Sequence, residues 1–325
     1  MNIFLKAWLL ASIFFVSQVD ATTISIVNLD SAGEGFRSNA PVAPVAGNPA
    51  TTLGGQYLNV FRAAAKVWEK RINSPVNISI DARLDPLNCS PQSGVLGAAG
   101  PLSGFINFPN APRSNVIYVV AQANSLAGID LDTAKSDIAA TFNSSVGTPG
   151  CLTQLSWWLG INSKAPTGTI SLFSTVLHEI GHGLGFLSLV DENGARLAGL
   201  NDAYMLNLFD VSQGKPWSSM SNAGRRSSTI NNGGLVWNGS NVAAGAGVFT
   251  AGRTSNRLRM YAPSSFQSGS SVSHWDVSVS PDELMEPFAT ETSNGCATVL
   301  ALKDMGWSTL NECVSLFQPR VIITP

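Results

Sequence analysis

The sequence predicts an α+β fold in two parts. Up to residue 186, helical stretches with an apolar face alternate with stretches of two-residue apolar period, which is typical of helices packed on a sheet. Residues 187–325 are rich in Gly, Ser and Asn and hold only short apolar runs, so we expect an irregular, loop-rich subdomain there. At 325 residues the chain is long enough for one large core or two smaller ones.

The first 21 residues have the pattern of a secretory signal peptide. Lys6 supplies a positive charge, a short apolar run follows, and Val19, Asp20 and Ala21 form a typical cleavage site. The apolar run is too short to cross a bilayer, so we expect cleavage near Ala21 and no membrane span in the mature chain. The pattern specifies export, either to the periplasm or to the medium.

Hydrophobic periodicity places the remaining elements of the first part, 22–186. Residues 76–84 alternate strictly between apolar and polar side chains, whereas 56–72 repeat their apolar residues at helical spacing. The expected order is a strand over 22–28, a helix over 56–72, a strand over 76–84, a strand or helix over 116–126, a strand over 138–142, an edge strand over 155–159 and a helix over 171–186. In the second part we expect a short helix over 202–209 and a late helix over 300–305.

The helix expected over 171–186 contains the sequence His-Glu-Ile-Gly-His. His178 and His182 then lie on one helical face, one turn apart, where two imidazoles can bind the same metal ion. Glu179 need not be a ligand and can act as general base on a water activated by the metal. Only three histidines occur in the chain, so this spacing favours a metal site over a core helix that happens to carry histidines.

A catalytic zinc site usually has three protein ligands, so one more is expected. In the compact pattern H-E-x-x-H-x-x-G-x-x-H the third histidine would stand where this chain has Ser188. His274 is the remaining imidazole and is therefore the expected third ligand. The alternative is an acidic third ligand, for which the candidates are Glu192, Asp202 and Asp210.

Three separate pieces of sequence together resemble the metzincin zinc metallopeptidases. They are HEIGHGLGF, SHWD around His274, and ELMEP around Met285. The chain is most similar to the leishmanolysin-like branch and to related secreted bacterial metallopeptidases, in which a long insertion precedes the third histidine and a Met-turn follows it. The resemblance implies a twisted mixed sheet with the motif helix in 22–186, and a long insertion, the third histidine and the Met-turn in 187–325.

This resemblance also implies an activity. The chain would be a secreted endopeptidase with one catalytic Zn²⁺ held by His178, His182 and His274, and with Glu179 as general base. Met285 would pack beneath the metal without binding it. The edge strand, expected at 155–159, would bind a protein or peptide substrate in extended form.

The main alternative is an exported adhesin or binding module on a metallopeptidase scaffold that has lost activity. Charged residues make up 12% of the chain, its net charge is −2, and it contains no basic block, so nucleic acid is not an expected partner. The sequence does not specify an oligomeric state.

The four cysteines predict disulfides, because an even number in an exported chain is typical of cross-linked proteins. Three connectivities are possible. Proximity along the chain favours Cys89 with Cys151 and Cys296 with Cys313.

Overall fold

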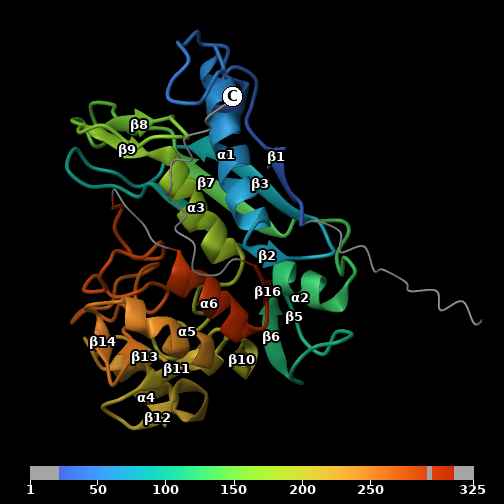
Figure 1. Ribbon diagram of the computed structural model, residues 1–325, viewed down its shortest axis with the longest axis vertical. Helices are drawn as coiled ribbons and strands as arrows, with labels where there is room; N and C mark the ends of the chain where they lie inside the picture. The colour runs from blue at the N-terminus through green and yellow to red at the C-terminus, as the bar shows by residue number, and fades with distance from the viewer. Residues whose placement is uncertain (1–21, 291–294, 311–325) are drawn as a thin grey trace, which may run out of the picture.

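The structure, a computed structural model, describes residues 22–290 and 295–310 and is a mixed α+β fold, as expected (Figure 1). Its main sheet has the strand order β1-β3-β7-β4. These strands are β1 (Ile24–Asn28), β3 (Ile78–Asp85), β7 (Ile138–Asn143) and β4 (Gly97–Pro101). The first three are parallel and β4 is antiparallel to β7, so the sheet is mixed and β4 forms one edge. The predicted signal peptide lies outside the described residues.

Two helices pack side by side against this sheet, α1 (Leu53–Glu69) and α3 (Leu172–Gly183) (Figure 1). The first begins three residues before its predicted start, because the Thr52 side chain caps it by accepting a hydrogen bond from the Gly55 N–H at 3.2 Å. The buried Trp68 indole N–H donates to the Leu177 carbonyl at 3.0 Å and so joins the two helices.

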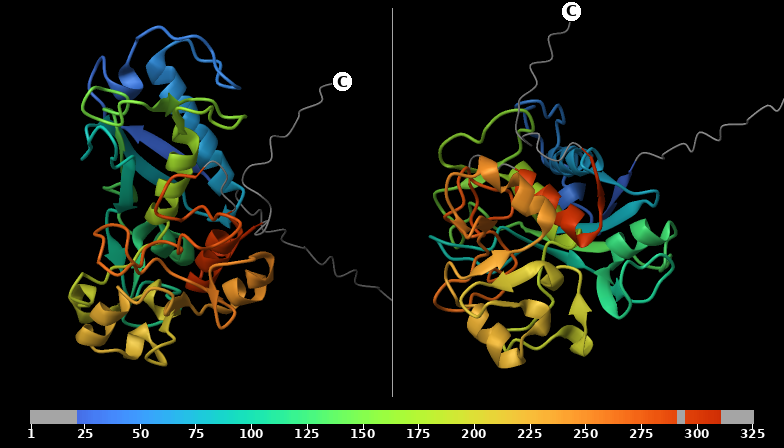
Figure 2. Two further views of the ribbon diagram at one scale, coloured as in Figure 1. Left: turned by 90° about the vertical axis from the view of Figure 1, so that its left-hand side faces the viewer. Right: turned by 60° about the horizontal axis from the view of Figure 1, so that its bottom comes forward.

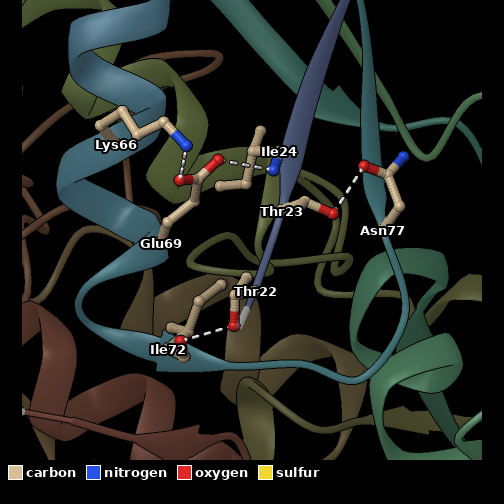
Figure 3. A network of polar contacts seen from close by, with 7 residues as sticks. All are labelled: Thr22, Thr23, Ile24, Lys66, Glu69, Ile72 and Asn77. Carbon is tan, nitrogen blue, oxygen red and sulfur yellow. Dashed lines mark hydrogen bonds and ion pairs between the residues drawn. The ribbon is translucent and has the colours of Figure 1, made fainter. Parts of the chain in front are cut away.

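Polar contacts hold the start of β1 against α1, β2 (Ile72–Asn73) and the residue that precedes β3 (Figure 3). Glu69, at the end of α1, accepts a hydrogen bond from the Ile24 N–H at 2.9 Å and pairs with Lys66. The Thr22 hydroxyl donates to the Ile72 carbonyl at 2.8 Å. These contacts fix the end of α1 relative to the sheet.

Short elements make up the rest of the described chain. Those of the first part are β2 (Ile72–Asn73), β5 (Gly104–Phe105), β6 (Val116–Val119), α2 (Val120–Ala127), β8 (Ser156–Trp158) and β9 (Thr169–Ser171). Those of the second part are β10 (Asn201–Asp202), β11 (Leu208–Asp210), β12 (Lys215–Pro216), α4 (Asn222–Ser228), β13 (Leu235–Trp237), α5 (Ser240–Gly245), β14 (Arg253–Thr254), β15 (Arg257–Leu258), α6 (Cys296–Met305) and β16 (Ser308–Thr309). Single 3-10 turns span Gly35–Arg37, Leu197–Gly199, Met205–Asn207, Trp217–Ser219 and Ala246–Val248.

The two parts of the chain are joined by strand pairing and by a shared core. β10 pairs with β6, and β16 pairs with β2, so both pairings cross residue 186. One hydrophobic core cluster includes Trp68 and Leu177 from the first part and Trp237 and Trp275 from the second. The left-hand view of Figure 2 shows the C-terminal segments, yellow to red, gathered at one end and the main sheet at the other. Division at residue 186 stays a prediction.

Two expected elements differ from the structure. The segment 202–209 is not a helix, because the Asp202 carboxylate accepts a hydrogen bond from the Met205 N–H and turns the chain from β10 through a 3-10 turn into β11. The strand expected at 155–159 is β8, which pairs with β9 and not with the main sheet. The ambiguous segment 116–126 is a strand, β6, followed directly by a helix, α2.

One of the two expected disulfides is confirmed. Cys89 and Cys151 are bonded, with Cα atoms 5.1 Å apart, and close a loop of sequence separation 62. Cys296 takes part in a disulfide, whereas its predicted partner Cys313 lies outside the described residues, so that pairing stays a prediction. Among the described helices, none is long and apolar enough to span a membrane.

Removing the first disulfide should destabilise the fold, since a cross-link over this separation lowers the entropy of the unfolded chain. We expect the Cys89→Ser/Cys151→Ser variant to lose about 2–4 kcal/mol of unfolding free energy. Urea denaturation of variant and wild type measures this difference. An unchanged midpoint would contradict it. Ser93→Ala, in the same loop, is the control for a local surface change.

Candidate metal centre

The helix α3 forms where its sequence places a cap and an apolar face. The Ser171 side chain accepts a hydrogen bond from the Ser174 N–H at 3.1 Å, which confirms the expected N-cap. After the helix ends at Gly183, Gly185 takes a left-handed φ of 110°, so the chain turns away within one turn of His182. Both histidines of the motif thus lie close to the end of a rigid helix.

The structure brings the three histidines of the chain together. The Nε2 atoms of His178 and His182 lie 3.1 Å apart, and the Nε2 atom of His274 lies 3.1 Å from the first and 3.2 Å from the second. His274 comes from the loop between β15 and α6. Within the described ranges, these residues form the one group of His, Cys, Asp or Glu that is close enough to bind a metal ion.

Backbone carbonyls fix the tautomer of all three imidazoles. Each Nδ1 lies within hydrogen-bond distance of one carbonyl oxygen: Leu284 for His178 at 2.8 Å, Phe186 for His182 at 2.7 Å, and Ser270 for His274 at 2.8 Å. A carbonyl oxygen only accepts, so each Nδ1 carries the proton and each Nε2 presents a lone pair. Three lone pairs that face one another are the donor set of a metal site, and the residues present therefore fit a metal ion.

Burial keeps these imidazoles neutral. It lowers the pKa of His178 to about 4 and that of His182 to about 3, and it holds the pKa of His274 well below its usual range. Repulsion among the rings adds to this effect at His182 and His274. At neutral pH all three are therefore in the protonation state that binds metals.

The segment that carries Met285 packs against α3 next to the two motif histidines. Met285 is fully buried, and a Cβ added at Gly181, between the two motif histidines, would lie 2.6 Å from its sulfur. The Met285 carbonyl accepts a hydrogen bond from the Trp275 N–H at 2.8 Å, next to His274. This segment therefore contacts both the motif helix and the loop that provides the third histidine.

Glu283 is a buried group of this segment that the sequence did not single out. Its Oε1 accepts hydrogen bonds from the Thr298 N–H and hydroxyl, both at 3.0 Å, and burial raises its pKa to about 8. The same hydroxyl accepts from the Trp275 indole at 3.1 Å. Glu283 thus links α6 to the residue beside His274. No sequence pattern marks it, because its partners are distant along the chain.

Glu179 is 7% exposed and lies in the same cleft as the histidines. Burial raises the pKa of its carboxyl to about 8, and a backbone hydrogen bond from Ala99 in β4 acts in the opposite direction. The general base expected from the sequence therefore lies against the edge strand of the main sheet.

The cleft has a volume of about 1250 Å³. On one side it is lined by residues 95–99, which lead into and include most of β4. The lining also includes residues 190–193, 266–271 and 286–290. The expected edge strand is thus β4 and not 155–159: β8 belongs to a separate two-stranded sheet and does not line the cleft.

None of the acidic candidates for a third ligand joins the histidines. Glu192 lines the cleft but is not part of the metal-binding group. The carboxylate of Asp202 accepts from the Met205 N–H at 2.8 Å, and that of Asp210 accepts from Gln213 and Asn231. The two aspartates hold turns of the second part.

No protein-family model matches this chain, and no curated protein matches it either. The resemblance to metzincins thus remains an expectation based on the motifs.

If His274 completes the site, its loss should weaken metal binding while loss of an acidic candidate should not. Loss of a group that only supports a metal ligand costs about 10–100-fold in affinity, so we expect His274→Ala, which removes a ligand, to bind Zn²⁺, used as the probe, at least about 100-fold more weakly than wild type. Competition with a chromophoric chelator measures this affinity. Asp202→Asn is the matched control and should bind as wild type does; the reverse pattern would make Asp202 the ligand.

Proposed function

We propose that this chain is a secreted, zinc-dependent endopeptidase of the metzincin type. The observation that carries the proposal is the set of three neutral imidazoles with facing Nε2 atoms, beside a buried glutamate in a large cleft. The order of the motif helix, His274 and Met285 along the chain also supports it.

Zinc suits the site because imidazole nitrogens are among its preferred ligands, and three protein ligands leave a position for chemistry. His178, His182 and His274 would hold the ion. When bound, a zinc ion supplies a Lewis acid that lowers the pKa of water and polarises a carbonyl, and a positive charge that favours the ionised form of a nearby carboxyl.

Glu179 is the proton carrier of the proposed reaction. Its carboxylate accepts a proton from the attacking water as the water oxygen bonds to the scissile carbonyl carbon. It then gives that proton to the amide nitrogen as the carbon–nitrogen bond breaks. The products are a carboxylic acid, which releases its remaining proton to solvent, and an amine. The position of Glu179 in the cleft, one residue from His178, supports this role.

The outer edge of β4 at residues 97–99 is the proposed substrate-binding element. Within the described chain, β4 pairs with β7 on one side only, and its cleft-lining residues 97–99 lie next to Glu179. An extended peptide could add to this edge through backbone hydrogen bonds and place a peptide bond beside the histidines. This geometry favours a protein or peptide as substrate.

Export is part of the proposal. The Cys89–Cys151 disulfide agrees with an oxidising compartment, and the pattern of residues 1–21 is that of a signal peptide.

Replacing Glu179 tests the proposal directly. We expect Glu179→Gln to lower kcat for labelled casein by about 10²–10⁴-fold, because the amide cannot accept the proton, while Zn²⁺ binding stays intact. Glu34→Gln, the same change on the surface, is the control. Full activity of the Glu179 variant would refute the role of this residue. Bound zinc without any phenanthroline-sensitive casein hydrolysis in the wild type would favour a binding module.

A further inference from the structure

Gly97, in the edge strand β4, has a backbone conformation that does not require glycine. It has no left-handed φ, so an alanine could adopt its conformation. A Cβ added there, however, would lie 3.0 Å from Cγ and 3.1 Å from Oε1 of Glu179. It would also lie 3.1 Å from a ring carbon of Phe142 in β7. These distances are tighter than ordinary van der Waals contacts, so one neighbour would have to move.

We propose that Gly97 is a positioning residue for Glu179: the missing side chain leaves the space that the glutamate occupies at the edge of the sheet. Glycine inside a strand often marks a site where another group approaches closely. Here the approaching group is the side chain of Glu179, whose Cγ and carboxylate oxygen are the nearest atoms.

The neighbouring residues of β4 support this assignment. Successive side chains of a strand point to opposite faces, so Gly97 and Ala99 share the face toward Glu179. Ala99 lines the same cleft as Glu179. Gly97 therefore provides room for the Glu179 side chain on the face of β4 that borders the cleft.

Gly100 is the natural contrast within the same strand. It lies on the opposite face from Gly97, and a Cβ added there would meet nothing within 4 Å. It is not among the residues that line the cleft. The two glycines thus differ in what surrounds them and not in the strand that contains them.

Gly97 acts on catalysis only if the proposed function holds, so the first measurement is activity. We expect Gly97→Ala to lower kcat for labelled casein by about tenfold or more, since small misplacements of a catalytic group have large effects. KM and bound zinc should stay close to the wild-type values, and Gly100→Ala should keep the wild-type kcat. An unchanged kcat in Gly97→Ala would overturn the inference.

A second measurement does not depend on activity. We expect Gly97→Ala to lower Tm in the wild-type background but much less in a Glu179→Ala background, in which the crowded atoms are absent. An equal loss in both backgrounds would mean that Phe142 takes up the strain, and it would overturn the inference. If wild type hydrolyses no casein, the proposed function fails. The comparison of Tm in the two backgrounds still decides whether Gly97 makes room for Glu179.

Discussion

The structure around the cleft is organised by three imidazole nitrogens whose lone pairs face one another. Carbonyl oxygens from three different segments bind the Nδ1 side of the rings and leave the Nε2 side without a proton. Nitrogen lone pairs this close to one another repel. A cation at their centre would relieve this, so the free energy of metal binding would become part of the stability of the fold.

The loop-rich second part is held in place by contacts next to His274 and by others farther away along the chain. The backbone around His274 is fixed by two contacts. The His274 carbonyl accepts a hydrogen bond from the Tyr261 N–H at 2.9 Å, and the next residue, Trp275, packs in the shared core. Farther out, the buried Arg225 donates to the carbonyls of Gly194, Trp217 and Met220. Long-range polar contacts thus substitute for regular helices and sheets in this part.

The features that the sequence predicts well are those with a local cause. The motif helix has a capping serine and a helical apolar period, and β3 alternates strictly, with every second residue from Ile78 to Leu84 buried. His274 was found because the motif lacked one imidazole and the chain offered one more. The Cys89–Cys151 pairing follows from chain proximity.

The features that the sequence does not predict arise from contacts between residues far apart in the chain. β4 has the sequence Gly-Ala-Ala-Gly-Pro, which carries no apolar alternation, so its strand conformation depends on pairing with β7. The carbonyls that orient the imidazoles belong to the backbone, which every residue type shares, so no sequence pattern indicates them. In 202–209, Tyr204, Met205 and Leu208 are spaced as in a helix, but the Asp202 side chain competes for the backbone N–H of Met205.

Close packing around α3 finally shows why the motif helix tolerates an unfavourable residue in its last turn. Glycine inside a helix costs about 1 kcal/mol relative to alanine. At Gly181, however, any side chain would collide with the sulfur of Met285, and at Gly97 it would crowd Glu179. The helix is thus held between the methionine on one side and the sheet edge on another. At Gly181 and at Gly97, the space left by the neighbouring side chains determines which residue fits, rather than the intrinsic preference of the helix or the strand.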